Sequence, residues 1–275
     1  MLGRIIKIIS NLYTVETKDG LVECRARGKF RNDSITPLVG DKCIIDKENN
    51  YILEILPRTN ELSRPLIANV DAALIVTSVK KPNLSLNLLD KMINIVTINN
   101  IESILCFSKL DLLDKQETKE IKKIISYYKK IGYKVIINKE YKKLNKLLKG
   151  KIVVITGQTG AGKSTLLNKM DKTLNLKTDE ISESLGRGKH TTRHTEVFKF
   201  KNFYIADTPG FSSLDFGNLS KEEIKNSFVE FKKYTCPFKD CMHSKEVDCE
   251  VKKAVEKGEI LASRYNNYLD FIKNK

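Results

Sequence analysis

Apolar and polar residues alternate over short stretches of the first 65 residues, and turn-forming residues separate the stretches. A period of two predicts β-strands that bury one face. Several such strands in so short a region favour a small β-barrel of the oligonucleotide-binding (OB) kind. The predicted strands are residues 4–9, 12–17, 22–27, 42–46 and 51–56.

From residue 66 onward, short apolar runs alternate with helix-like segments. This alternation is typical of an α/β domain with a doubly wound, mostly parallel sheet. Ser85 is expected to cap the helix that ends near Ile98. The predicted strands are residues 70–79, 104–107, 133–137, 152–156 and 203–206.

The last part of the chain is predicted to be helical. Ser220 and Glu223 have the spacing of a capping box for a helix that ends near Lys233, and further helices begin near Asp248 and Glu259. The chain is therefore multidomain. The predicted domains are a barrel over residues 1–65, an α/β domain over 66–218 and a helical module over 219–275.

The net charge of +15 indicates a polyanionic partner. Residues 115–151 hold thirteen Lys and three Glu, and so ten of the fifteen excess charges. That stretch is either a solvated face or a surface for nucleic acid. A second candidate RNA-binding site surrounds Phe30 in the barrel, where the alternative is a charged hairpin tip. Its cations are Arg25, Arg27, Lys29 and Arg31.

No apolar segment approaches the roughly twenty residues that span a bilayer, and no signal peptide is evident, so we expect a cytoplasmic protein without membrane contact. Cytoplasmic cysteines are either buried thiols or metal ligands. Cys236, Cys241, His243 and Cys249 make a closed Cys₃His set that suits one structural zinc ion. The alternative is three unrelated thiols beside a surface histidine.

A phosphate-binding loop with the spacing GxxxxGKS follows the predicted strand 152–156 and opens a helix. Lys163 is expected to reach the β and γ phosphates, and Ser164 to bind Mg²⁺. Asp207 is expected to hold Mg²⁺ through water, and the Gly210 N–H to sense the γ phosphate. The predicted phosphate-binding residues are Gly157, Gln158, Thr159, Gly160, Ala161, Gly162, Lys163, Ser164, Thr165, Asp207 and Gly210.

A predicted base-reading motif, Ser108-Lys109-Leu110-Asp111, follows the strand 104–107. The Asp111 carboxylate can accept from both N1–H and the 2-amino group of guanine, a pair of donors that adenine lacks. The Lys109 stem would lie along the base. In an ordinary GTPase the phosphate loop comes first, so this order predicts a circularly permuted nucleotide domain.

These motifs, in this order, resemble the bacterial ribosome small-subunit-dependent GTPase A family over essentially the whole chain. The most specific pieces are residues 186–192, residues 207–211 and the Cys₃His set. The resemblance implies a GTPase that binds the 30S subunit and its 16S rRNA late in maturation and is activated by them. We expect it to act as a monomer.

The resemblance also implies roles for the loop before residue 193. His190 is expected to position the attacking water, because Phe211 stands where many GTPases carry a glutamine. The alternative is that His190 is a loop residue that faces phosphate or RNA. One of Thr191 and Thr192 should contact Mg²⁺. Two departures from the family pattern concern the base. Ser108 replaces Asn or Thr, and its shorter side chain is expected to weaken the link between the base and the phosphate loop. Asn138-Lys139 replaces a Ser-Ala pair, which puts the base contacts of that loop in question.

Two other functions stay open at this point. One is a nucleotide-gated RNA-binding module in which hydrolysis is incidental. The other is a P-loop ATPase, which Asp111 disfavours.

Overall fold

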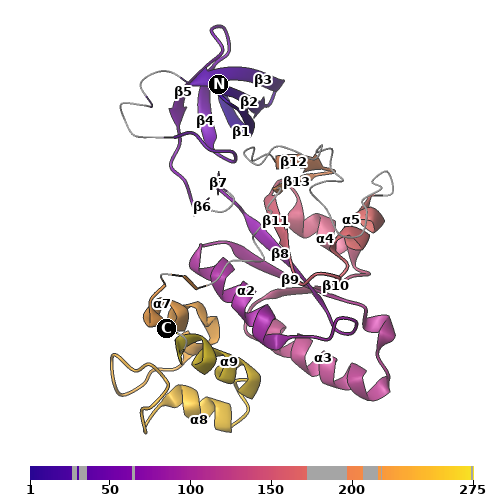
Figure 1. The fold of residues 1–275 in the computed structure, drawn as a ribbon, viewed down its shortest axis with the longest axis vertical. Coiled ribbons are helices and arrows are strands. Elements are labelled where there is room, and N and C mark those ends of the chain that lie inside the picture. Colours follow the sequence, from indigo (N-terminus) through magenta and orange to yellow (C-terminus); the bar gives the residue numbers. More distant parts are fainter. Residues whose placement is uncertain are drawn as a thin grey trace.

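The computed structural model describes residues 1–26, 30, 36–63, 66–171, 197–206, 216–217, 219–273 and 275. Figure 1 shows the N-terminal barrel at one end of the molecule, an α/β region in the middle and a helical module at the other end. Among the described residues, no helix is long and apolar enough to cross a membrane.

The N-terminal strands close into a barrel in the order β1-β2-β3-β5-β4. Gly3 lies in β1 where this strand pairs with β2. A Cβ at Gly3 would lie 2.4 Å from Val15 Cγ1, so the close approach requires glycine. The five-stranded barrel predicted from alternation is confirmed. The strands are β1 (Leu2–Ile9), β2 (Leu12–Thr17), β3 (Gly20–Ala26), β4 (Lys42–Asp46) and β5 (Tyr51–Ile55). Their inward side chains include Ile5, Val15, Cys24, Cys43, Ile45 and Ile52.

A short hairpin that the sequence pattern does not predict joins the barrel to the α/β region. It consists of β6 (Glu61–Ser63) and β7 (Leu66–Ala68). Beside it, the buried Asp41 carboxylate accepts from Arg58 Nε and Nη2 at 2.8 and 2.7 Å. The ion pair holds the end of the barrel against the connection.

The central sheet has the order β10-β9-β8-β11-β13-β12. All neighbours are parallel except the edge pair β12–β13. The doubly wound prediction is therefore confirmed, with one antiparallel edge strand added. The strands are β8 (Ala72–Ser78), β9 (Glu102–Ser108), β10 (Lys134–Ile137), β11 (Ile152–Thr156), β12 (Val197–Phe200) and β13 (Phe203–Ala206).

Helices cover both faces of this sheet. On one face, α2 (Leu86–Ile98) and α3 (Lys115–Lys130) pack into one apolar cluster. On the other, α4 (Tyr141–Leu148) and α5 (Lys163–Met170) pack into a second. The central strands between them are mostly apolar because both of their faces are buried.

The barrel also contacts the edge of the sheet. Glu16 in β2 accepts from the Tyr204 hydroxyl in β13 and from Lys199 Nζ in β12, the latter at 3.3 Å. Ile6 and Ile8 of β1 pack against the apolar cluster of the sheet. The edge hairpin β12–β13 of the sheet thus contacts the barrel.

The C-terminal module lies against α2 (Figure 1). It contains α7 (Lys221–Ser227), the 3₁₀ helix η3 (Val229–Lys233), α8 (Glu250–Glu256) and α9 (Ala262–Lys273). The capping box of Ser220 and Glu223 is confirmed. The single helix predicted to reach Lys233 is wrong, because the backbone leaves helical geometry at Phe228, whose ψ is 90°.

Candidate nucleotide and metal sites

The phosphate loop and the base-reading motif lie at the same edge of the sheet. Strands β8, β9 and β11 are parallel neighbours, and they end at Ser78, Ser108 and Thr156. The carboxyl edge of such a sheet is where nucleotides bind in doubly wound folds. The arrangement therefore brings together two motifs that are about fifty residues apart in the chain.

Two glycines let the phosphate loop leave β11 and enter α5. Gly157 has a φ of 140°, and a Cβ there would lie 2.0 Å from the Val76 carbonyl oxygen of β8. Gly162 has a φ of 93° and is the N-cap of α5. Any side chain at Gly157 would push the loop away from β8. The loop therefore opens directly onto a helix N-terminus, where backbone N–H groups favour an anion.

Lys163 and Ser164 occupy the first turn of α5. The Lys163 ammonium donates to the carbonyl oxygens of Gly157 and Gln158 at 2.8 and 3.1 Å, so it lies along the loop backbone. Ser164 is buried under the loop. Both positions are those that a phosphate-binding lysine and an Mg²⁺-binding hydroxyl occupy in this motif.

Ser108 forms a direct link between the two motifs. Its buried hydroxyl donates to the Ala161 carbonyl at 2.6 Å, inside the phosphate loop, and also lies 3.3 Å from the Thr77 carbonyl. The short side chain suffices because β9 ends beside the loop. A serine at this position therefore keeps the connection that the departure from Asn or Thr put in question.

The rest of the base-reading motif turns outward after Ser108. Lys109 has left-handed backbone geometry, with φ 60° and ψ 30°, and its ammonium donates to the Lys81 carbonyl. Leu110 and Asp111 lie in the 3₁₀ turn η1 (Leu110–Leu112), with Asp111 exposed. The carboxylate is therefore available to a ligand at the sheet edge.

The second base-contacting loop also reaches this edge. Asn138 directly follows β10, and its N–H donates to the Phe107 carbonyl at 3.0 Å. Ile137 pairs in register with Phe107, so the Asn138-Lys139 pair begins beside Ser108 on the neighbouring strand. The backbone of this loop therefore starts at the same edge of the sheet as the base-reading motif.

Several predicted site residues lie outside the described residues. They are His190, Thr191, Thr192, Asp207 and Gly210 in the nucleotide domain, and Arg27, Lys29 and Arg31 in the barrel. The strand β13 ends at Ala206, one residue before Asp207, and runs parallel to β11.

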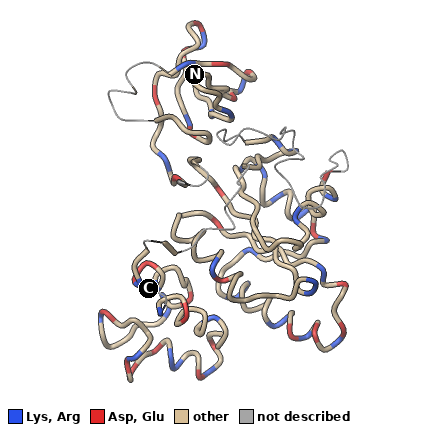
Figure 2. Tube along the Cα trace, viewed as in Figure 1, with Lys and Arg blue, Asp and Glu red and all other residues tan. Residues whose placement is uncertain are grey.

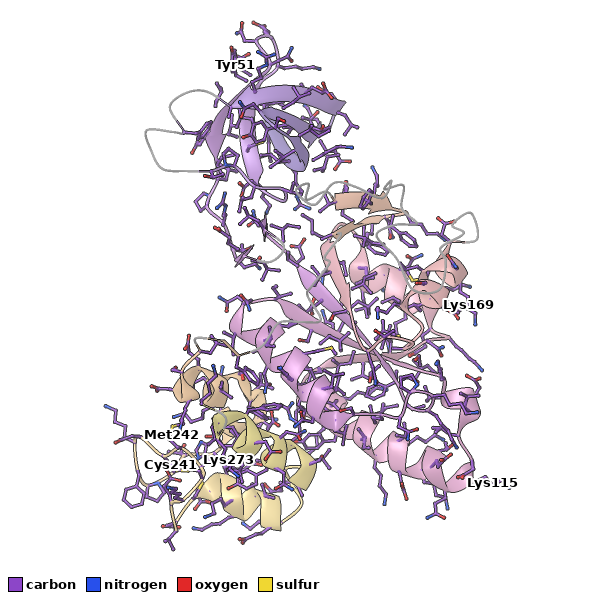
Figure 3. The ribbon with its side chains drawn as sticks, in the orientation of Figure 1. Tyr51, Lys115, Lys169, Cys241, Met242 and Lys273 are labelled. Atoms are coloured by element: carbon purple, nitrogen blue, oxygen red, sulfur yellow. The ribbon has the colours of Figure 1, made fainter. Side chains whose placement is uncertain are left out.

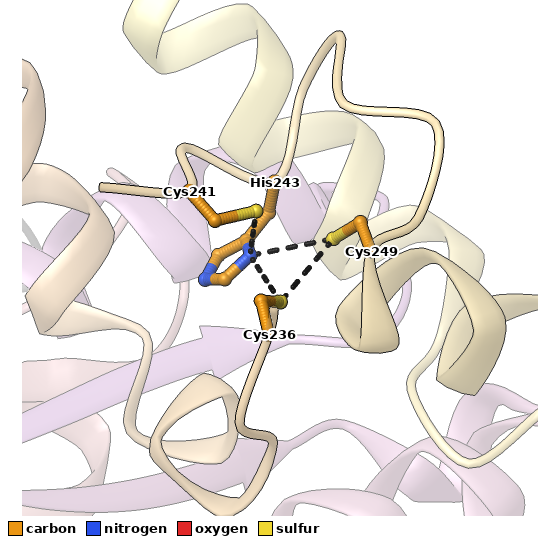
Figure 4. Close-up of side chains that lie close together, drawn as sticks. All are labelled: Cys236, Cys241, His243 and Cys249. Carbon is orange, nitrogen blue, oxygen red and sulfur yellow. Dashed lines mark hydrogen bonds between the residues drawn. The ribbon is translucent and has the colours of Figure 1, made fainter. Parts of the chain in front are cut away.

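The Cys₃His residues converge in the C-terminal module (Figure 4). His243 Nδ1 lies 3.5, 3.3 and 3.4 Å from the Sγ atoms of Cys236, Cys241 and Cys249, and the Cys236 and Cys249 sulfurs are 3.8 Å apart. Tetrahedral zinc with ordinary bond lengths requires about 3.6 Å between nitrogen and sulfur and about 3.8 Å between sulfurs. The four atoms thus fit a tetrahedral metal centre.

Without a metal, the thiols of this cluster keep their protons, and a metal ion would have to displace them. Burial raises the pKa of the Cys241 thiol to about 12 and raises that of Cys249, while burial lowers the pKa of the His243 imidazole. Bringing three thiolates together in a buried site is unfavourable unless a metal compensates their charge. By geometry and by the types of its ligands, the cluster could hold a metal ion.

Comparison with known proteins places these features in one family. The family model described as RsgA GTPase matches residues 55–217, and the RsgA N-terminal domain model matches residues 2–52. The chain belongs to the RsgA GTPase family. The resemblance seen in the motifs is therefore confirmed, and it extends over both the barrel and the sheet.

Named RsgA relatives align over nearly the full chain. The small ribosomal subunit biogenesis GTPase RsgA of Enterococcus faecalis is 45% identical over 98% of this chain and 94% of its own length. The protein of the same name from Bacillus velezensis is 46% identical over 98% and 96%.

Two solved structures share the fold of this RsgA family member. YjeQ from Thermotoga maritima has a TM-score of 0.86 at 34% identity, covering 99% of this chain and 97% of that one. YloQ, described as a circularly permuted GTPase, has a TM-score of 0.83 at 36% identity, covering 99% and 94%. The permuted order inferred from the motifs is thus the order of this fold.

Proposed function

We propose that this chain is a GTP hydrolase that binds the small ribosomal subunit, is stimulated by it and acts late in its maturation. The observation that carries the proposal is a full-length match to proteins named for small-subunit biogenesis, in a chain whose phosphate and base loops are joined through Ser108. In this role the protein would act in the cytoplasm and as a monomer.

In the proposed reaction, Lys163 contacts the β and γ phosphates and the loop backbone holds them. Ser164, Asp207 and one of Thr191 and Thr192 would hold Mg²⁺, which neutralises charge on the phosphates. The Ser164 hydroxyl lies in the first turn of α5, where a hard oxygen ligand suits that ion. His190 would orient the attacking water, and Asp111 would select guanine.

We assign zinc to the Cys₃His cluster. Three thiolates and one imidazole leave no open coordination position, so the role is structural. The metal would hold the loops from residue 236 to 249 onto the helices of the C-terminal module.

The RNA-facing surface that we propose lies on the barrel. Arg25 is exposed in β3 and pairs in register with Tyr51 of β5, which is 38% exposed and projects from the barrel in Figure 3. A cation beside an accessible aromatic ring suits a nucleic-acid strand. Lys and Arg are also present along the rest of the molecule, including α3 (Figure 2), which adds to attraction for an RNA backbone.

Co-sedimentation with purified 30S subunits tests this proposal. We expect binding that is tighter with a non-hydrolysable GTP analogue than with GDP and that weakens steeply with salt. Arg25→Glu should weaken binding without changing intrinsic GTP hydrolysis, while Glu54→Gln, an exposed change in β5, should leave binding at least as strong. Equal binding to 50S subunits would contradict the proposal.

A further inference from the structure

A completely buried arginine lies where the C-terminal module meets the nucleotide domain. Arg264 of α9 donates through Nε and Nη2 to both oxygens of Glu230 in η3, at 2.7 and 2.9 Å. Through Nη1 it donates to Asp90 of α2 at 2.8 Å. Its guanidinium also stacks over the Phe228 ring at 4.5 Å. Every direction of its planar head is thus occupied, and the group can take one position only.

Asp90 extends the network into a third helix. Its Oδ1 also accepts from the Tyr128 hydroxyl of α3 at 2.5 Å, and its Oδ2 accepts from Asn267 of α9 at 2.6 Å. Burial raises the pKa of Tyr128 well above its ordinary value, so the phenol stays a donor. The network therefore fixes α2, α3, η3 and α9 to one another.

Helix α2 carries this position to the phosphate loop. Two residues further along it, Met92 Sδ accepts from the hydroxyl of Thr156, the residue directly before Gly157, at 3.9 Å. Leu88 and Leu89 of α2 and its capping residue Ser85 line a small cavity together with Gln158 of the phosphate loop. A displacement of Asp90 would therefore move the residues of α2 that contact the phosphate loop.

Helix α3 carries the same position to the base loop. Its capping residue Asp114 follows Asp111 by three residues, and its Glu117 pairs with Lys80 of the loop after β8 at 2.7 Å. The two helices that meet at Asp90 are the ones attached to the two halves of the nucleotide site.

On its other side, the network reaches the metal cluster. Phe231, next to Glu230, packs edge-on against the His243 ring with centroids 5.4 Å apart. Tyr265, next to Arg264, donates to the His243 carbonyl at 2.8 Å, and Tyr268 donates to the Met242 carbonyl. Figure 3 places Met242 and Cys241 beside α9. Direct contacts thus link His243 to α9, and α9 to α2.

We propose that Arg264 is a positioning residue for the nucleotide site, and that through it nucleotide binding and metal retention are coupled. The inference rests on the proposed function, because it needs the phosphate loop to bind a guanine nucleotide. A binding coupling is reciprocal, so metal in the cluster should strengthen nucleotide binding by the same factor by which nucleotide strengthens metal binding. A purely structural arginine requires no such link.

Metal extraction by a zinc-selective chromogenic chelator, with and without saturating GDP and Mg²⁺, tests the proposal. In the wild-type chain we expect GDP to lower the apparent metal dissociation constant by at least about fivefold. Removal of the metal should raise the dissociation constant for GDP by the same factor. If GDP binds tightly but leaves the metal dissociation constant unchanged, the proposal is overturned. If GDP does not bind at all, it is the proposed function that fails.

Substitutions locate the coupling in the network. Arg264→Met alone leaves two buried carboxylates unpaired, so the informative variant is Arg264→Met with Asp90→Asn and Glu230→Gln, which removes all three charges at similar volume. We expect this variant to fold, bind one metal ion and lose the coupling. Lys273→Met, an exposed change on the same helix, should keep it. A folded, metal-loaded triple variant with full coupling would overturn the assignment to Arg264.

Discussion

Replacing Ser108 with alanine removes a buried side-chain link between the base loop and the phosphate loop. The hydroxyl donates to the Ala161 carbonyl at 2.6 Å, and both residues are almost inaccessible to solvent. Leaving a buried acceptor without its donor costs about 1–3 kcal/mol. Part of that cost falls on folding, because the bond exists in the structure without nucleotide.

Nucleotide binding should weaken as well, because without this bond the two loops of the free protein are no longer held at the separation that the base and the phosphates require, and binding must restore it. We expect about 1–2 kcal/mol, which is a roughly 5- to 30-fold rise in Kd. The factor should be similar for GTP and GDP, because Ala161 precedes the residues expected at the γ phosphate. Fluorescent-nucleotide titration measures both constants, and thermal unfolding reports the stability share.

Ser103 supplies a matched control on the same strand. Its buried hydroxyl has no hydrogen-bond partner among the described residues, so Ser103→Ala should leave both Kd values and stability nearly unchanged. A Ser108→Ala protein that is folded and binds GDP within twofold of the wild type would refute the role given to this bond.

Three further substitutions or treatments probe the other assignments. Lys163→Ala should abolish turnover, by at least about 100-fold, in a folded protein, because the ammonium lies along the phosphate loop; near-normal turnover would reject the phosphate site. Asp111→Asn should weaken GTP binding and shift preference toward xanthosine triphosphate, whose O2 accepts from an amide; unchanged discrimination in competition titrations would show that Asp111 does not read the base. Metal analysis should find about one zinc ion per chain, and its removal should unfold the C-terminal module as seen by circular dichroism; a folded, metal-free module would reject the zinc assignment.

The strands that hold the nucleotide motifs could be predicted because their chemistry is local. A run such as residues 152–156 is apolar on both faces, and the loop after it has a fixed spacing around Gly157. The Cys₃His set could be predicted for the same reason, because its four residues lie within fourteen positions of the chain. Such features need no knowledge of distant contacts.

The features that sequence reasoning missed depend on residues far apart in the chain. Arg264 meets Asp90 across 174 positions, and a charged residue in a helix ordinarily indicates a solvated face. The strands β6 and β7 have three residues each, too few for alternation to be visible. The break at Phe228 arises because its ring packs under Arg264 and against Tyr268, which overrides local helix propensity.

The reach of Ser108 belongs to the same class. Its shorter side chain suggested a weaker link to the phosphate loop than Asn or Thr would give. Parallel pairing of β9 with β8, and of β8 with β11, sets the end of β9 next to Ala161. Tertiary placement, not side-chain length, decides whether the bond forms.

The rate of GTP hydrolysis as a function of added 30S subunits is the most direct measurement of the central claim. We expect a slow intrinsic rate that rises and saturates with 30S subunits, falls back at high salt and does not respond to 50S subunits. A rate that stays at its intrinsic value while co-sedimentation shows the protein bound to 30S subunits would contradict it.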